Sequence, residues 1–296
     1  MASPQLEVVI QLLRANPPVQ GDTIAEQRAN MAAALGSLPR PPDVDYRKVD
    51  AGGVPSEWVI APESRADRVL IHLHGGAYTM GGPDSHRLLA TRLARTARAR
   101  VLLPDYRLAP EHPHPAAVED AAAAYRFVLG QGLAPSRIAI SGDSAGGGLA
   151  AAVLVALRDA GDPLPAAGVL ISGWLDLTLR GESIRTKADV DPMVTVALLR
   201  QSGEAYAKGS DPRAPTASPV FADLAGLPPL LVQVGGREIL LDDSRAFAER
   251  ARQAGVDVSL EVWDEMIHVW HAFADLLPEG VQACERIAEF LERRWS

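Results

Sequence analysis

The sequence predicts an α/β protein with a mostly parallel central sheet, flanked by helices on both faces and covered by a helical cap. Three observations predict it. Short apolar segments with strand character alternate with helical patterns from about residue 44 onward. The residues before that point form two helical stretches. The chain has 296 residues, 47% of them apolar and 22% charged, which is ordinary for one large domain with an added segment.

The first 43 residues are predicted to form a helical segment of the cap. Apolar side chains recur on one face of the first helix, at Leu6, Val9, Ile10 and Leu13. Pro17-Pro18 ends this helix, and a second helical stretch covers residues 22–35. Prolines at 39, 41 and 42 then mark a break. We therefore expect an N-terminal cap segment, residues 1–43, followed by an α/β domain, residues 44–296.

The α/β domain is predicted to begin with a hairpin around Ala51-Gly52-Gly53. The expected strands are 46–50, 54–61, 68–73, 100–103, 137–140, 167–171, 230–234 and 258–262. The expected helices are 84–96, 115–129, 145–160, 243–254 and a last one ending near 294. Ligands bind such sheets at the carboxyl ends of the strands. Residues 175–227 are too long for a simple crossover, so this insertion is predicted to be partly helical and to contribute to the cap.

Composition excludes several classes of function. The net charge of −8 gives no support for a nucleic-acid partner. No run of about 18 apolar residues is present, so no membrane span is predicted. The first residues lack a secretion signal, and Cys284 has no possible disulfide partner within the chain, which fits a reducing, cytoplasmic location. Cys284 lies in the predicted last helix and is expected to be a partly buried structural thiol.

A glycine-flanked serine follows the strand 137–140. Gly142, Ser144 and Gly146 match the pattern G-x-S-x-G, with an apolar strand before it and an alanine-rich helix after it. A turn this tight strains the serine backbone and leaves no room for a Cβ at either glycine. It lifts Ser144 above the sheet edge and directs the Ala145 N–H toward a developing oxyanion. Ser144 is the predicted nucleophile; a phosphate-binding turn is disfavoured because no lysine follows the glycines.

A second glycine pair follows the strand 68–73. In the sequence His74-Gly75-Gly76, the glycines leave backbone N–H groups unobstructed beside a substrate. Gly75 and Gly76 are therefore predicted to join Ala145 as oxyanion donors. His74 is expected to brace the loop by hydrogen bonds, and His72, inside the strand, to be a structural histidine.

A serine nucleophile needs a base, and a carboxylate to orient that base. His268 is the predicted base because it lies in a loop just beyond the last strand, whereas His271 is expected to pack in a following helix. Three carboxylates compete as the acid after the strand 230–234. Glu238 is favoured because it lies closest to the strand end, while Asp242 and Asp243 open a helix, where acidic residues are common anyway.

Taken together, these motifs resemble the hormone-sensitive-lipase-like esterases, also called bacterial family IV. The resemblance covers the chain from Val44 onward and rests on the following segments: 74–76, 142–147, the late Glu238 and His268, 104–111 with Pro113 and Pro115, 211–212 and 218–219. It implies the α/β-hydrolase fold with a helical cap, hydrolysis of short-chain acyl esters with no cofactor, and often a homodimer. Two positions depart from the family: Ala77 replaces a frequent third glycine, and Glu238 replaces a frequent aspartate.

The predicted function is that of a carboxylesterase acting on a small-molecule ester through a Ser-His-acid triad and an acyl-enzyme intermediate. The resemblance and the cap favour acyl chains of about four to eight carbons. No metal site is expected. An amidase, lactonase or carbamate hydrolase would use the same residues, because pocket shape decides the leaving group. A ligand receptor on a hydrolase scaffold is disfavoured because His268 is present.

Several polar residues near these motifs are given structural roles. Four charged or phenolic residues of one loop are expected to pair with each other and order it: Asp105, Tyr106, Arg107 and Glu111. Asp143, beside the nucleophile, is expected to be a structural hydrogen-bond partner.

Overall fold

The computed structural model describes residues 2–35, 38 and 40–295. Its centre is an eight-stranded sheet with the strand order β1-β2-β4-β3-β5-β6-β7-β8. The strands are β1 Asp45–Asp50, β2 Pro55–Ile60, β3 Arg65–Leu73, β4 Ala99–Pro104, β5 Ile138–Asp143, β6 Ala167–Ile171, β7 Leu230–Gly235 and β8 Val258–Trp263. β2 runs antiparallel to β1 and β4, and the strands from β4 to β8 are parallel. The predicted mostly parallel sheet is confirmed.

Side chains of the central strands alternate between two apolar cores, one on each face of the sheet. In β3, Val69 and Ile71 belong to one core and Leu70 to the other. In β5, Ile140 and Ala139 divide in the same way. This alternation follows from the period of two residues in a strand. Because both faces are buried, the middle segments of these strands, Val69–Ile71 and Ile138–Ile140, are wholly apolar.

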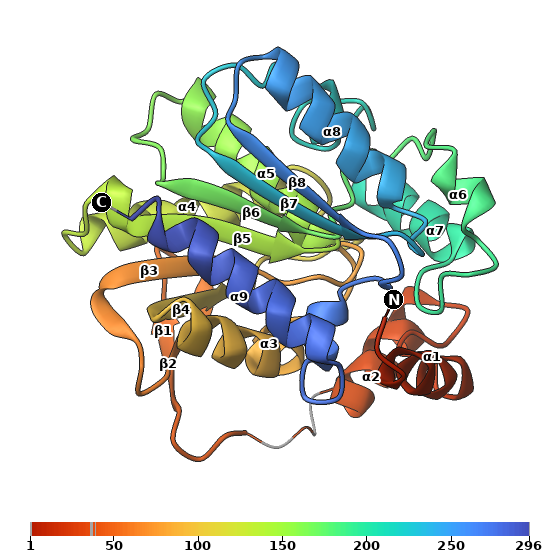
Figure 1. Cartoon of the computed structure of the whole chain (residues 1–296). Coiled ribbons are helices and arrows are strands. Elements are labelled where there is room, and N and C mark those ends of the chain that lie inside the picture. Colours follow the sequence, from red (N-terminus) through yellow and green to blue (C-terminus); the bar gives the residue numbers. More distant parts are fainter. Residues whose placement is uncertain (1, 36–37, 39, 296) are drawn as a thin grey trace.

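Helices cover both faces. α3 (Pro83–Thr96) and α9 (Pro278–Glu292) pack on one face and lie in front of the sheet in Figure 1. α4 (Ala116–Gly130), α5 (Ala145–Asp159) and α8 (Leu241–Gln253) belong to the other core. Cys284, in α9, is fully buried rather than partly buried as expected.

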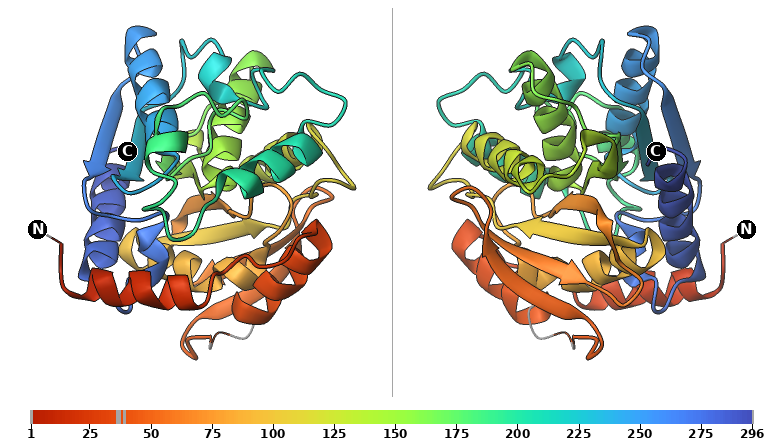
Figure 2. Two further views of the ribbon diagram at one scale, coloured as in Figure 1. Left: turned by 90° about the vertical axis from the view of Figure 1, so that its right-hand side faces the viewer. Right: turned by 90° about the vertical axis from the view of Figure 1, so that its left-hand side faces the viewer.

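The N-terminal helices and the insertion gather at one end of the sheet. α1 (Gln5–Ala15), α2 (Ile24–Leu35), α6 (Ser183–Thr186) and α7 (Val196–Tyr206) all lie at the end toward which the arrows of β5 and β6 point (Figures 1 and 2). The side-chain amide of Gln27 on α2 donates to that of Gln201 on α7 at 2.9 Å, which joins the two segments. The insertion also contains the short 3-10 helix η2, Pro219–Phe221.

The apolar face of α1 packs on the loop that follows β8. Leu6, Val9 and Ile10 form one cluster with Ile267 and Trp270. This cluster lies directly beside His268, so the first predicted helix of the chain contacts the loop that carries the predicted base.

Element boundaries differ from the predictions by a few residues at most points. β3 begins at Arg65, with a shift of register against β4 between Arg65 and Val69. A 3-10 helix, η1, covers Pro135–Arg137 before β5. His271 lies in a helix, as expected, which is the short 3-10 helix η3 (Trp270–Phe273). Among the residues described, no helix combines the length and apolar character needed to cross a bilayer.

Candidate active site

Ser144 occupies the turn between β5 and α5. Its backbone angles, φ 56° and ψ −122°, lie in a region that non-glycine residues seldom adopt. Hydrogen bonds from neighbouring segments hold it there: the Ser144 N–H donates to the Ile171 carbonyl at 2.9 Å, and its carbonyl accepts from the Trp174 N–H at 2.9 Å. The strained conformation predicted for this serine is confirmed.

The two flanking glycines are needed because backbone atoms fill the space of a side chain. A Cβ at Gly142 would lie 2.0 Å from the Gly146 carbonyl oxygen, as the tight turn requires. A Cβ at Gly146 would lie 2.0 Å from the Leu73 carbonyl oxygen, at the end of β3. The second glycine therefore allows contact with the neighbouring strand as well as closure of the turn.

His268 and Glu238 form a buried pair. The His268 Nδ1 lies 2.8 Å from the Glu238 Oε2, and the two residues are 3% and 0% exposed. The other carboxylate oxygen, Oε1, accepts the Ser172 hydroxyl at 2.7 Å and the Gly235 N–H at 2.6 Å. The Ser172 Oγ in turn accepts the Val269 N–H at 3.1 Å. These contacts fix both the carboxylate and the loop that carries the imidazole.

The charge of Glu238 sets the basicity of His268. Burial alone would lower the pKa of His268, but the charge and hydrogen bond of Glu238, together with the charge of Asp191, outweigh it and raise this pKa above 6.5. With the Nδ1 proton donated to Glu238, the Nε2 of the neutral ring is left to accept a proton. This is the arrangement that a general base requires.

The two competing aspartates have other partners. The Asp242 Oδ2 accepts the Ser183 N–H at 2.8 Å. The Asp243 Oδ2 accepts the N–H groups of Leu175 and Asp176, each at 3.0 Å. Burial raises the pKa of Asp243 to about 8. Both aspartates tie the start of α8 to the insertion, and neither is hydrogen-bonded to His268.

The glycine loop after β3 lies against Ser144. A Cβ built on Gly75 would lie 3.2 Å from the Ser144 Cβ. The Gly75 N–H, however, already donates within the protein, to the Asp143 Oδ1 at 3.2 Å and the His86 Nε2 at 3.1 Å. This engagement does not suit the predicted donor role of Gly75. The N–H groups of Gly76, Ala77 and Ala145 have no acceptor among the residues described.

A second Ser–His–Asp chain lies beneath the loop and is structural. The Ser141 Oγ lies 2.9 Å from the His72 Nδ1, and the His72 Nε2 lies 3.1 Å from the Asp143 Oδ1. Ser141 and His72 are both fully buried, so no substrate reaches them. Burial alone would raise the pKa of Asp143, but the charges and hydrogen bonds of His86 and His72 hold it well below its ordinary value. Asp143 thus connects the strand end to the glycine loop, as a structural partner.

The remaining histidines of this region pack as expected. The ring of His74 stacks on Tyr106 at 4.1 Å, and its carbonyl accepts the Tyr106 hydroxyl at 2.7 Å. Burial lowers the pKa of His74 to about 3, so the ring is neutral. His271 is fully buried and bonded to the Gln233 side chain at 2.7 Å, and burial lowers its pKa to about 3 as well.

The expectation that the charges of the loop 105–111 pair with each other is wrong. Arg107 pairs with Asp120 and Glu119 on α4 instead. Glu111 pairs with Arg28 on α2 at 2.7 Å. The partners come from helices that flank the loop, which the local sequence does not reveal.

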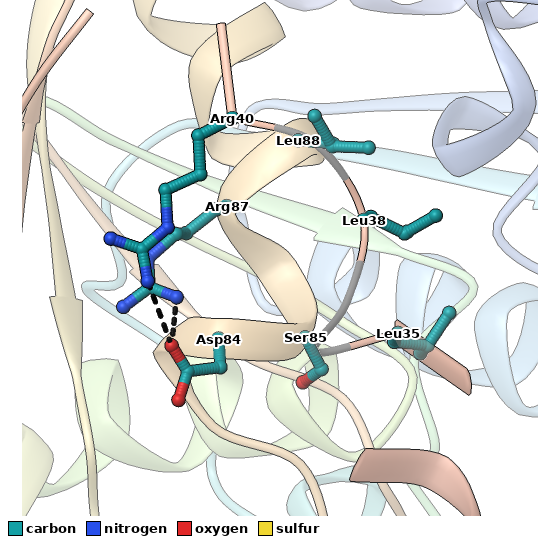
Figure 3. A pocket seen from close by; sticks show the side chains of 7 residues that line it. All are labelled: Leu35, Leu38, Arg40, Asp84, Ser85, Arg87 and Leu88. Carbon is teal, nitrogen blue, oxygen red and sulfur yellow. Dashed lines mark hydrogen bonds and ion pairs between the residues drawn. The ribbon is translucent and has the colours of Figure 1, made fainter. Parts of the chain in front are cut away.

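Two hollows lie away from Ser144. The larger, of about 710 Å³, lies beside β1, β2 and the start of α3. In the smaller, Arg40 and Arg87 both converge on the carboxylate of Asp84 (Figure 3). Arg87 is also bonded to Glu57 on β2, at 2.5 and 2.8 Å. Neither hollow is lined by Ser144, Glu238 or His268.

Two residues at the site were not found from the sequence. Ser172 directly follows β6, and its position at the carboxyl edge of the sheet is the signal that could have found it. Asp191 lies in the insertion, where no periodic pattern marks it. Among the described residues, no group of three or more His, Cys, Asp or Glu side chains could hold a metal ion.

Comparison with known proteins places this site in a family. A family model described as alpha/beta hydrolase fold matches residues 70–272, which include both the serine turn and the histidine loop. The chain is therefore an α/β hydrolase. An acetyl-hydrolase of Streptomyces hygroscopicus is 49% identical over 98% of this chain and 97% of its own length. An esterase of Acinetobacter venetianus is 41% identical over 86% of this chain and 84% of its own.

Solved structures of esterases are also similar to this chain. An esterase from the bacterial hormone-sensitive lipase family superposes with a TM-score of 0.96 at 51% identity, covering all of both chains. The esterase EstE5 superposes with a TM-score of 0.96 at 45% identity, covering 99% of each. The chain belongs to the hormone-sensitive-lipase-like esterases of the α/β-hydrolase fold, and it is a serine carboxylester hydrolase.

Proposed function

We propose that this protein hydrolyses short- to medium-chain acyl esters with Ser144 as nucleophile, His268 as base and Glu238 as the orienting acid. The observation that carries the proposal is the buried His268–Glu238 pair, joined at 2.8 Å. In the same sheet, the strained Ser144 directly follows β5. A carboxylate bonded to Nδ1 leaves Nε2 to act on the serine hydroxyl.

The reaction has two steps. In the first, His268 takes the Ser144 proton as the hydroxyl oxygen bonds to the ester carbonyl carbon, and the imidazolium is stabilised by Glu238. His268 then protonates the departing alcohol as the carbon–oxygen bond breaks. In the second step, His268 takes a proton from water, which attacks the acyl-enzyme, and Ser144 regains its proton as the acid leaves.

The oxyanion formed in each step needs backbone donors. We assign this role to the N–H groups of Gly76, Ala77 and Ala145, because none of them has an acceptor among the residues described. Gly75, predicted as a donor from the sequence, is assigned instead to positioning the loop, because its N–H is engaged by Asp143 and His86. Ala145 also begins α5, whose dipole favours negative charge at this end.

Labelling by an organophosphate tests the nucleophile. Paraoxon should phosphorylate Ser144 and release p-nitrophenol, since the reaction requires a serine activated by a working base. Mass spectrometry of the intact protein and of its peptides checks the site of the adduct. The matched control is Ser141, which has a histidine and an aspartate in line but is fully buried. An adduct on Ser141, or none at all, would contradict the proposal.

The acyl chain is proposed to be short or medium in length. The helices α1, α2, α6 and α7 lie together at the carboxyl end of β5, the strand that Ser144 follows, and as a cap they would limit the room for long chains (Figure 2). A relative of this chain is called an acetyl-hydrolase, in keeping with a small acyl group. With p-nitrophenyl esters of two to twelve carbons, kcat/KM should be highest at about four to eight carbons. A maximum of kcat/KM at twelve carbons would contradict the proposed preference for short or medium acyl chains.

The homodimer and the cytoplasmic location remain predictions. Cys284, the one cysteine of the sequence, is buried in α9, and burial raises its pKa to about 12, so a reactive thiolate is not formed there. Such a thiol is compatible with a reducing compartment.

A further inference from the structure

The turn that carries Glu238 is held by the insertion. Ile239, the residue after Glu238, has both backbone polar groups bonded to insertion side chains. Its N–H donates to the Asp191 Oδ2 at 3.0 Å, and its carbonyl accepts the Ser183 hydroxyl at 2.7 Å. The Ser183 Oγ also accepts the Asp242 N–H at 3.1 Å. Side chains of the insertion therefore hold the turn by hydrogen bonds to its backbone.

Asp191 is itself fixed in one orientation. Its Oδ1 accepts the N–H groups of Met193 and Val194, each at 2.9 Å, while Oδ2 is used for Ile239. A carboxylate with three backbone donors has little freedom to turn. Met193 also packs in the cluster that contains Ile267, on the loop of His268. Asp191 thus lies between the acid turn and the base loop.

We infer that Asp191 is a positioning residue for the ester hydrolysis: it holds the Glu238 turn through Ile239 and supplies a further negative charge that stabilises protonated His268. The inference rests on the proposed triad. It explains why a half-buried aspartate of the insertion is bonded to the residue after Glu238 although it contacts neither proposed reacting residue. Asp191 adds its charge to those of Glu238 and Asp143, which also favour the imidazolium.

The effect of removing Asp191 on the pKa of His268 depends on the other charges around His268. Three carboxylates act to raise its pKa: Glu238, Asp191 and Asp143. On α1, Glu7 is paired with Arg237 at 3.1 Å, and on the loop of His268 itself Asp264 is exposed. Without Asp191, Glu238 and Asp143 remain. The shift in the pKa of His268 should therefore be downward but partial.

The test is Asp191→Asn in the full chain, with Asp189→Asn as the control. Asp189 is exposed and two residues away, so its substitution removes the same charge from the insertion surface. With p-nitrophenyl butyrate, Asp191→Asn should lower kcat about tenfold or more, because the amide nitrogen faces backbone donors, while KM stays near the wild-type value. The control should behave as wild type.

The pH profile separates positioning from a merely structural role. Losing a negative charge makes the imidazolium less stable, so neutral His268 persists to lower pH. The ascending limb of kcat/KM should move to lower pH by about half a unit or more. Ser183→Ala loosens the same turn without changing charge. It should therefore lower kcat but leave the ascending limb of the kcat/KM profile at the same pH. The inference would be overturned if the ascending limb of kcat/KM lay at the same pH in Asp191→Asn as in the wild-type enzyme.

A second variant and a wild-type measurement keep the test decisive. If Asp191→Asn does not fold, Asp191→Ser, whose hydroxyl accepts in the same kind of turn, should show the same shift, and an unmoved limb there overturns the inference equally. Wild-type enzyme that paraoxon fails to label would reject the triad itself. If paraoxon labels the wild-type enzyme but the pH profile of the Asp191 variant is not shifted, only the role of Asp191 is rejected.

Discussion

Replacing Ser144 with alanine should lower kcat for p-nitrophenyl butyrate by roughly 10⁴- to 10⁶-fold. The variant keeps the proposed oxyanion donors and the His268–Glu238 pair but has no oxygen to attack the carbonyl carbon. A residual rate above that of water is expected from these donors and from substrate binding. The measurement is p-nitrophenol release at saturating ester, with the enzyme purified free of host esterases.

The loss should occur without loss of the fold. The Ser144 side chain makes no capping hydrogen bond at the start of α5, and alanine keeps the same Cβ. The free energy of unfolding should therefore change by less than about 1 kcal/mol. Ser144→Gly should be equally inactive and at least as stable as Ser144→Ala, because glycine accepts a φ of 56° without strain. Wild-type turnover by either folded variant would reject Ser144 as the nucleophile.

Replacing Glu238 with glutamine should lower kcat by about 10⁴-fold. The Glu238 Oε1 accepts from the Ser172 hydroxyl and the Gly235 N–H, so the single oxygen of glutamine should stay at that side. Its amide nitrogen then faces the His268 Nδ1 and donates to it. The ring proton must move to Nε2, and in this tautomer the ring cannot accept the Ser144 proton. Steady-state kinetics with p-nitrophenyl butyrate measure the loss.

Asp242→Asn and Asp243→Asn provide the comparison. Burial raises the pKa of Asp243 to about 8, so at pH 7 its carboxyl is mostly protonated and asparagine is nearly equivalent to it. Asp242 holds Ser183 and has no bond to His268. Both variants should keep kcat within about tenfold of wild type per folded enzyme. If one of them shows the 10⁴-fold loss and Glu238→Gln does not, the acid has been assigned to the wrong residue.

Much of the site could be predicted because its signals are local. The serine turn is specified within five residues, since the space between Gly142 and Gly146 admits only glycines. The alternation of short strands and helices predicts a parallel sheet, and the carboxyl ends of parallel strands lie at one edge. His268 follows the last strand, so its position could be predicted from chain order alone.

Other assignments depended on which way a side chain points across long separations. Glu238, Asp242 and Asp243 lie within six residues of each other, and the sequence does not tell which one reaches a histidine 30 residues away. The engagement of the Gly75 N–H depends on Asp143, which approaches it from another strand. Arg107 likewise finds its partners on α4 and not in its own loop.

The sequence by itself therefore determined the fold class, the strained serine turn and the histidine loop, because each follows from backbone sterics or from the period of apolar residues. Only the tertiary structure shows that Glu238 is the carboxylate that meets His268, that the Gly75 N–H is engaged by Asp143 and His86, and that Asp191 is bonded to Ile239 beside Glu238. Those outcomes depend on contacts between segments that are distant in the chain, whose packing leaves no periodic or local pattern in the sequence.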